Sequence, residues 1–152
     1  MRGCLIDTSI WIAASFAEHD HHTLVGRFLA TTSLAWPACL CRATEQSWLR
    51  LLTTPTLHRR FDCAEVTNRD AWQIVSKAMQ RPNIRFIERE PRDLRLLWHR
   101  LAGLSSASPK VWMDAYLAAF AIGHGLELAT LDRDFDRFVK AGLKLRLLAE
   151  SD

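Results

Sequence analysis

The chain has 152 residues, a formal net charge of +3, a pI near 8.9 and an apolar fraction of 49 %. Its length favours a single domain over residues 1–152. No apolar run approaches the ~18–20 residues of a membrane-spanning helix, so the sequence predicts no membrane insertion. The mild positive charge permits a nucleic-acid partner without requiring one.

The N-terminus and the cysteines both indicate a reducing compartment. The first seven residues lack the basic, apolar and small-residue succession of a signal peptide, so we expect a cytoplasmic protein. Four cysteines stand at positions 4, 39, 41 and 63, without any C-x-x-C spacing. We therefore expect buried thiols and no disulfide framework.

The first predicted strand ends in an acid. Residues 4–6 form a short apolar run that stops at Asp7, and a helical pattern starts at about residue 10. Ser9 can cap that helix, and its hydroxyl can also reach a ligand held by Asp7. Because α/β folds bind ligands at the carboxyl ends of their strands, Asp7 is the first candidate site residue.

A polar loop and three further elements follow. Residues 18–22 contain three histidines; a solvated or substrate-facing loop is the favoured interpretation, and a zinc site is the alternative. A helix to about residue 30 and a strand at 34–36 come next. Residues 39–53 predict a helix in which Glu45 lies on or beside the apolar face, although an exposed glutamate is equally compatible with the spacing.

The middle of the chain is rich in arginine. We expect an irregular stretch over 57–66 to read the substrate together with the histidine loop. A helix follows to about residue 80, and Asn68 offers its N-cap. A strand at 84–87 and a helix over 92–101 follow. The arginines here predict either solvated faces and ion pairs with nearby acids or an RNA-binding stripe.

An apolar helix with one acid forms the centre of the prediction. Ser108 is a good N-cap, Pro109 suits the first helical position, and Gly123 or Gly125 can end the helix in a left-handed turn. Nearly every side chain between is apolar, which predicts a helix packed on most of its faces. Asp114 is the exception, and its carboxylate is costly to desolvate unless a cation or several donors meet it.

Two more acids are expected directly after a late strand. Residues 126–130 predict a strand that ends just before Asp132 and Asp134, and a short helix at 135–139 and a strand at 143–148 complete the chain. This alternation of strands and helices predicts a three-layer α/β/α fold whose central, mostly parallel sheet is flanked by helices.

Four acids are thereby expected at one edge of the sheet: Asp7, Glu45, Asp114 and Asp132. Like charges in a low-dielectric cleft repel each other, and divalent cations relieve that repulsion. Carboxylate oxygens suit Mg²⁺ or Mn²⁺. This inventory fits metal-assisted phosphodiester hydrolysis, in which an ion lowers the pKa of a bound water and no protein nucleophile is needed.

Four stretches resemble the PIN domain and, within it, the VapC-type ribonuclease toxins of type II toxin–antitoxin systems. They occur in the expected order and span almost the whole chain, at residues 5–9, 43–45, 113–118 and 129–135. Residues 48–55 also resemble a subset of these toxins. The resemblance implies a PIN-like fold and Mg²⁺- or Mn²⁺-dependent endonucleolytic cleavage of transfer RNA or ribosomal RNA. It also implies a homodimer and a VapB-like antitoxin whose C-terminal segment lies across the active site.

The resemblance also implies roles for individual residues. Asp7, Glu45 and Asp114 correspond to the acids that hold a first ion. Asp132 completes the site or holds a second ion, and Asp134, two residues later, is the alternative fourth acid or an anchor for the turn. Ser9 matches a small polar position near the metal. Two arginines are speculative phosphate contacts whose alternatives are a surface charge and a structural ion pair: Arg42 and Arg50.

Several other functions are compatible with part of the pattern. A haloacid-dehalogenase-like phosphatase needs a second acid where Ser9 stands, and a receiver-like domain needs an acidic pair near Asp7. A PIN-like module that binds RNA or protein without cutting is the main alternative, and metal dependence distinguishes it from a nuclease. An RNA-processing nuclease without an antitoxin shares the chemistry and differs in its gene neighbourhood.

Overall fold

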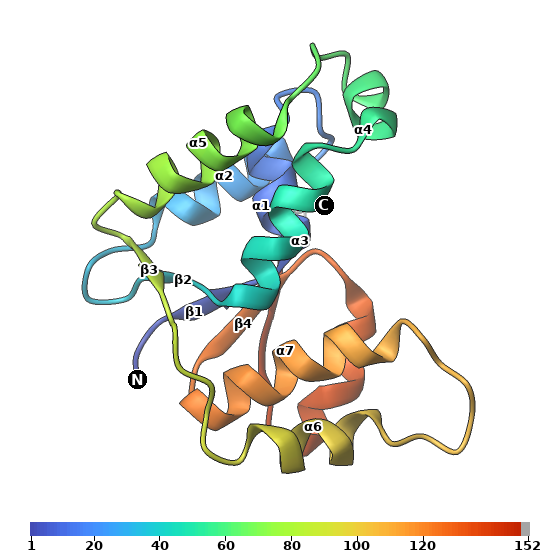
Figure 1. Ribbon diagram of the computed structural model, residues 1–152. Helices are drawn as coiled ribbons and strands as arrows, with labels where there is room; N and C mark the ends of the chain where they lie inside the picture. The colour runs from blue at the N-terminus through green and yellow to red at the C-terminus, as the bar shows by residue number, and fades with distance from the viewer. Residues whose placement is uncertain (150–152) are drawn as a thin grey trace.

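Five short strands form one all-parallel sheet at the centre of the molecule (Figure 1). The computed structural model describes residues 1–149. In spatial order the strands are β3-β2-β1-β4-β5, and all four pairings are parallel, as predicted. The strands are β1 (Cys4–Ile6), β2 (Ala38–Leu40), β3 (Ile84–Phe86), β4 (Glu127–Thr130) and β5 (Lys144–Leu147).

Helices cover both faces of this sheet, which confirms the predicted three layers. Figure 1 shows α1, α2, α3 and α5 above the sheet and α6 and α7 below it. The helical segments are α1 (Thr8–Ser15), α2 (His22–Ala30), α3 (Arg42–Leu52), α4 (Pro55–Arg60), α5 (Asn68–Met79), α6 (Leu94–Ala102), α7 (Val111–His124) and the 3₁₀ helix η1 (Arg133–Ala141).

Two hydrophobic cores result from the alternation of side chains along the strands. Leu5 and Leu128 pack with α6, α7 and η1 on one face. Ile6 and Ala129 pack with α1, α2, α3 and α5 on the other. Buried on both faces, the central strands are short and apolar, as parallel strands usually are. Asp7, the residue after β1, therefore follows a strand that lies between the two cores.

The start of the second βα unit differs from the prediction. Residues 34–36 form an exposed bend instead of a strand, and Leu34 is 70 % exposed. β2 follows four residues later, and α3 begins at residue 42 instead of 39. Cys41 caps α3 through two reciprocal contacts. Its backbone N–H donates to Thr44 Oγ1 at 3.0 Å, and the Thr44 backbone N–H donates to the Cys41 side chain. A cysteine-centred capping box is not a usual helix-start signal, which is why the pattern placed the boundary too early.

Three other boundaries also shift. A helix, α4, occupies the first part of the 57–66 stretch that was predicted to be irregular. α5 is capped one residue earlier than predicted, by Thr67, whose Oγ1 accepts from Asp70 N at 3.1 Å. α7 begins at Val111, since Ser108 accepts from Val111 N in a turn instead of capping the helix. Cap signals in sequence fix a helix end only to within a few residues.

Three of the four cysteines are buried as free thiols: Cys4, Cys39 and Cys41. Burial raises the pKa of all three, that of Cys39 to about 11. Cys63 is exposed, which contradicts the expectation of a buried thiol at that position. Among residues 1–149, none of the helices combines the length and apolar character needed to cross a bilayer.

Two glycines provide a test of backbone strain. Gly125 ends α7 with φ +69°, whereas Gly26 lies inside α2, and an added Cβ would contact nothing within 4 Å at either position. Gly125→Ala should lower the free energy of unfolding by about 1 kcal/mol, because the left-handed region disfavours a Cβ. Gly26→Ala should raise it by ~0.5–1 kcal/mol. Urea unfolding of both variants checks this, and equal effects would contradict it.

Candidate active site

Asp7 lies at the carboxyl end of the central strand and is only 8 % exposed. Its backbone N–H continues the β1–β4 ladder by donating to Ala129 O at 2.9 Å. Its Oδ2 accepts hydrogen bonds from Thr130 Oγ1 at 2.7 Å and from Ser9 Oγ at 2.8 Å. Burial raises the pKa of Asp7, and the two hydroxyl groups offset part of that effect.

The two hydroxyl groups have a fixed hydrogen-bond direction. Ser9 Oγ accepts from Leu131 N at 3.2 Å, and Thr130 Oγ1 accepts from Asp132 N at 3.0 Å. Backbone N–H groups only donate, so each hydroxyl directs its own hydrogen to the Asp7 carboxylate. This network ties the end of β1 to the loop after β4. The sequence analysis overlooked Thr130; a hydroxyl residue ending a buried strand was the available signal.

Asp132 and Asp134 occupy the turn after β4, and both are exposed. Asp132 Oδ1 accepts from Asp134 N at 2.8 Å, which caps η1. Asp132 therefore anchors this turn and is also tied to Thr130 through its backbone. The Asp134 carboxylate lies near enough to Asp114 to contribute to the raised pKa of that group.

Asp114 faces this group from the first turn of α7 and is partly buried. Its pKa is raised to about 6, first by burial and then by the negative charges of Asp7, Asp132 and Asp134; Arg137 offsets part of the rise. Four carboxylates from three separate segments are thus close enough to repel each other. The structure brings together three of the four acids expected as ligands, with Asp134 beside them.

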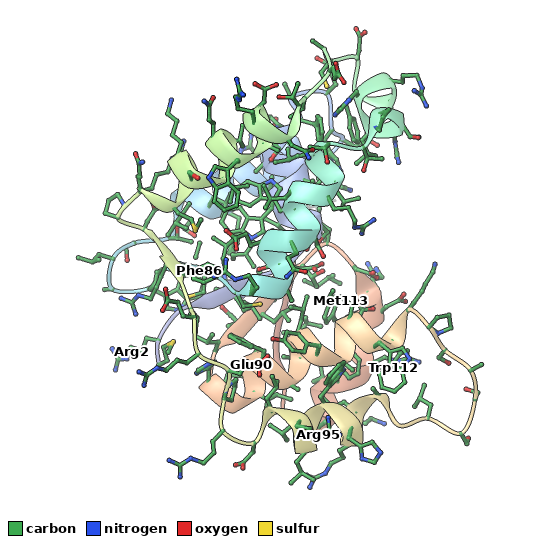
Figure 2. The ribbon with its side chains drawn as sticks, in the orientation of Figure 1. Arg2, Phe86, Glu90, Arg95, Trp112 and Met113 are labelled. Carbon is green, nitrogen blue, oxygen red and sulfur yellow. The ribbon has the colours of Figure 1, made fainter. Side chains whose placement is uncertain are left out.

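Glu45 is buried in the first turn of α3 and makes a different contact. Its carboxylate forms an ion pair with Arg42 three residues earlier. The Arg42 guanidinium also lies 4.5 Å from the centre of the Phe86 ring, which projects from β3 (Figure 2). Arg42 therefore has the structural ion pair that was the alternative to a phosphate contact. Arg50 is exposed near the end of α3.

The donor set fits a hard divalent cation, although the geometry is open. Within residues 1–149, no three His, Cys, Asp or Glu side chains form a closed ligand group for a metal ion. Mg²⁺ does not need one, because it usually takes one or two carboxylates together with waters and substrate oxygens. Asp7, Asp114 and Asp132 offer such oxygens, and their mutual repulsion is what a cation would remove.

The role of Thr130 can be tested by removing its hydroxyl with little change of shape. Thr130→Val should lower the free energy of unfolding by ~1–3 kcal/mol, because the Asp132 N–H loses its acceptor and Asp7 loses a donor. Thr23→Val on the exposed face of α2 is the control and should change it by less than ~0.5 kcal/mol. Similar values for the two variants in urea unfolding would refute the role.

The burial of Asp114 and the repulsion from its neighbouring carboxylates predict that its charge destabilises the metal-free protein. Because its pKa rises from 3.8 to about 6 on folding, this destabilisation is complete above pH 7 and fades as the pH falls from about 6 towards 4. In EDTA at pH 7.5, Asp114→Asn should therefore raise the free energy of unfolding, by about 1 kcal/mol after solvent screening.

Unfolding curves between pH 4 and pH 8 measure this effect, with Asp136→Asn as the exposed control on η1. The difference between Asp114→Asn and the unsubstituted chain should disappear near pH 4. A difference that is independent of pH, or one that the control reproduces, would rule out the charge of Asp114 as the cause.

The comparisons with known proteins agree with this fold. The family model for the PIN domain matches residues 4–141. Ribonuclease VapC41 of Mycobacterium tuberculosis is 41 % identical over 146 residues, which cover 96 % of this chain and 99 % of that protein. Ribonuclease VapC31 of the same organism is 32 % identical over 138 residues, which cover 88 % and 92 %.

Solved structures share the same architecture at lower identity. VapBC2 from Rickettsia felis, bound to a promoter DNA fragment, superposes with a TM-score of 0.66 at 12 % identity, covering 95 % of this chain and 98 % of that one. VapC20 of Mycobacterium tuberculosis gives 0.61 at 22 % identity, covering 95 % and 99 %. With this family match and the close relation to VapC41, the chain belongs to the PIN-domain family, among the VapC ribonucleases.

Proposed function

We propose that this protein is a metal-dependent endoribonuclease toxin of the VapC type. The observation that carries the proposal is the group of carboxylates from Asp7, Asp114 and Asp132 at the carboxyl edge of a PIN-domain sheet. The identity of 41 % to a protein named Ribonuclease VapC41 supports the same activity. The reaction is hydrolysis of a phosphodiester bond within an RNA chain.

Each acid has a distinct part in the proposed site. Asp7, Asp114 and Asp132 would hold Mg²⁺ or Mn²⁺, and Glu45 would join them on release from Arg42. The bound ion supplies the positive charge that acidifies a water molecule and neutralises phosphate oxygens. Ser9 and Thr130 hold Asp7 Oδ2 in place, so the carboxylate keeps one orientation while substrate enters.

The RNA substrate is a transfer RNA or a ribosomal RNA. VapC20, which has the same fold, is described as a toxin that cleaves the sarcin–ricin loop. The net charge of +3 is compatible with a polyanionic substrate. Arg50 is free of the ion pair that engages Arg42 and is the simpler candidate for a phosphate contact.

A VapB-like antitoxin is the proposed protein partner. Related folds are known from VapBC assemblies of Rickettsia felis and nontypeable Haemophilus influenzae. The antitoxin would neutralise the enzyme by covering the acidic edge, and the enzyme would act as a homodimer. An RNA-processing nuclease without an antitoxin would use the same residues, and only its gene neighbourhood would differ.

A non-catalytic RNA-binding module is less compatible with the charges. A group of carboxylates in which the neighbours raise the pKa of Asp114 repels a phosphate backbone unless a cation lies between them. A surface that only binds RNA gains nothing from such a group. The two functions differ in their dependence on metal.

Cleavage of purified transfer RNA and intact ribosomes tests the proposal. The protein, freed of antitoxin, is incubated with Mg²⁺, Mn²⁺ or EDTA. We expect discrete fragments that require the metal and a loss of at least ~100-fold in rate for Asp114→Asn, because the ion loses a ligand. Asp136→Asn, an exposed acid of η1, should cut within about twofold of the unsubstituted chain.

Mapping of the fragment ends identifies the RNA and the bond. Cleavage that persists in EDTA would contradict the metal-dependent mechanism. A folded, antitoxin-free protein that binds these RNAs but cuts neither, with any of the metals, would favour the binding module.

A further inference from the structure

A cavity of about 470 Å³ opens directly beside the acidic edge. It shares Ser9 and Asp132 with that edge, and its outer walls come from the loop between α1 and α2, from α4 and from the start of η1. Four of the lining side chains are basic or carry an imidazole ring: His19, His21, Arg60 and Arg133. We name these four the histidine–arginine subsite.

The histidine loop has a defined conformation. His19 Nδ1 accepts from His21 N at 3.1 Å, and His22 N donates to His19 O at 2.9 Å. The His22 ring bonds through Nδ1 to Ala13 O at 2.8 Å, which fixes the loop to α1. Because His19 Nδ1 is an acceptor, the neutral ring carries its hydrogen on Nε2. These contacts therefore hold the rings of His19 and His21, and the Nε2–H donor of His19, in a fixed arrangement.

Aromatic packing joins this loop to α4, and Figure 1 shows the two segments side by side. The His19 and Phe61 ring centres are 5.1 Å apart, and Phe16 stacks on Phe61 at 5.0 Å. The Arg60 guanidinium lies 5.3 Å from the centre of the Phe61 ring. Phe61 is buried, so it holds Arg60 and His19 together at one wall of the cavity. The two segments expected to read the substrate thus form one surface.

We propose that the histidine–arginine subsite binds one single-stranded nucleotide of the RNA substrate, next to the bond that is cut. Imidazole rings offer flat faces on which a base stacks, and the guanidinium groups of Arg60 and Arg133 suit a phosphate. The volume lies in the lower half of the ~300–1,000 Å³ range of sites that hold one small ligand. This inference rests on the proposed nuclease function and adds the residues that select the substrate.

Continuity with the acidic edge favours RNA over a protein partner. An RNA strand whose phosphodiester lies against Asp7 and Asp132 must continue to either side of them. The cavity begins at Ser9 and Asp132, so the neighbouring nucleotide reaches it without leaving the surface. The guanidinium groups of Arg60 and Arg133 then contact the RNA backbone just beyond the acidic residues.

Binding is tested with a 5′-fluorescein-labelled, single-stranded RNA of ten nucleotides and mixed sequence. Fluorescence anisotropy is measured with Mg²⁺ in the full chain carrying Asp114→Asn, which keeps the RNA intact. Adding Arg60→Ala or His21→Ala should weaken binding about 5- to 10-fold. For Arg60→Ala, the slope of log affinity against log salt should also become shallower by about 0.7.

Two further variants control for position and folding. Arg59→Ala is the matched control, because Arg59 is exposed on the same helix, contacts Thr56 and does not line the cavity; it should bind within about twofold. His19→Phe keeps a ring against Phe61, so it should fold normally and retain most of the stacking. Thermal unfolding of each variant confirms the fold.

The cleavage assay separates this proposal from the nuclease function. In the active chain, Arg60→Ala should raise KM about 5- to 10-fold, keep kcat within about twofold and cut at additional positions. Cleavage with the KM and cut sites of the Arg59→Ala control would overturn the subsite and leave the nuclease intact. RNA binding that depends on Arg60, in a chain that cuts no RNA, would support the subsite and refute the nuclease. Loss of antitoxin binding in Arg60→Ala, with RNA binding unchanged, would assign the cavity to the protein partner and overturn the proposal.

Discussion

The buried carboxylate of Asp7 is the constraint on which the site depends. It follows a central strand and is therefore enclosed, so its oxygens must be satisfied from nearby. The hydroxyl groups of Ser9 and Thr130 do this, and their own acceptor positions fix the loop after β4. One small network thereby positions Asp132 beside Asp7, while α7 brings Asp114 to the same edge. The arrangement is well ordered and electrostatically unfavourable, which is the state that a bound cation relieves.

Two different solutions to a buried negative charge occur within one molecule. Glu45 has a resident cation in Arg42, which is further held over the Phe86 ring. Asp114, in contrast, has partial compensation from Arg137, and Asp7 has the hydroxyl groups of Ser9 and Thr130. An ion pair within the protein satisfies Glu45 without a metal, whereas an exchangeable ion suits a group that must receive a phosphate. Movement of Arg42 would connect the two, since it would add Glu45 to the oxygens available at the edge.

The sequence predicted the alternation of elements and the parallel sheet because apolar runs and acids at strand ends are local signals. It misplaced the second strand because residues 34–36 look apolar yet form an exposed bend. It placed the start of α3 too early because a Cys41 cap is an uncommon helix start. It left the direction of Glu45 open because helical spacing cannot show a partner such as Arg42. Thr130 was missed for a related reason: its importance comes from a contact with a residue 123 positions away, which no local pattern contains.

That separation has a consequence for the protein as it is being made. The central strand β1 is synthesised well before its partner β4 and the Thr130 hydroxyl, which lies 123 residues after Asp7. A nascent chain that stops before residue 130 lacks the hydrogen bond that orients Asp7 and also lacks Asp132. Sheets built from such distant pairings form slowly, because the closure of long loops precedes the favourable contacts. The acidic edge can therefore assemble only after residue 132 has been synthesised, so products truncated before that residue carry no finished site.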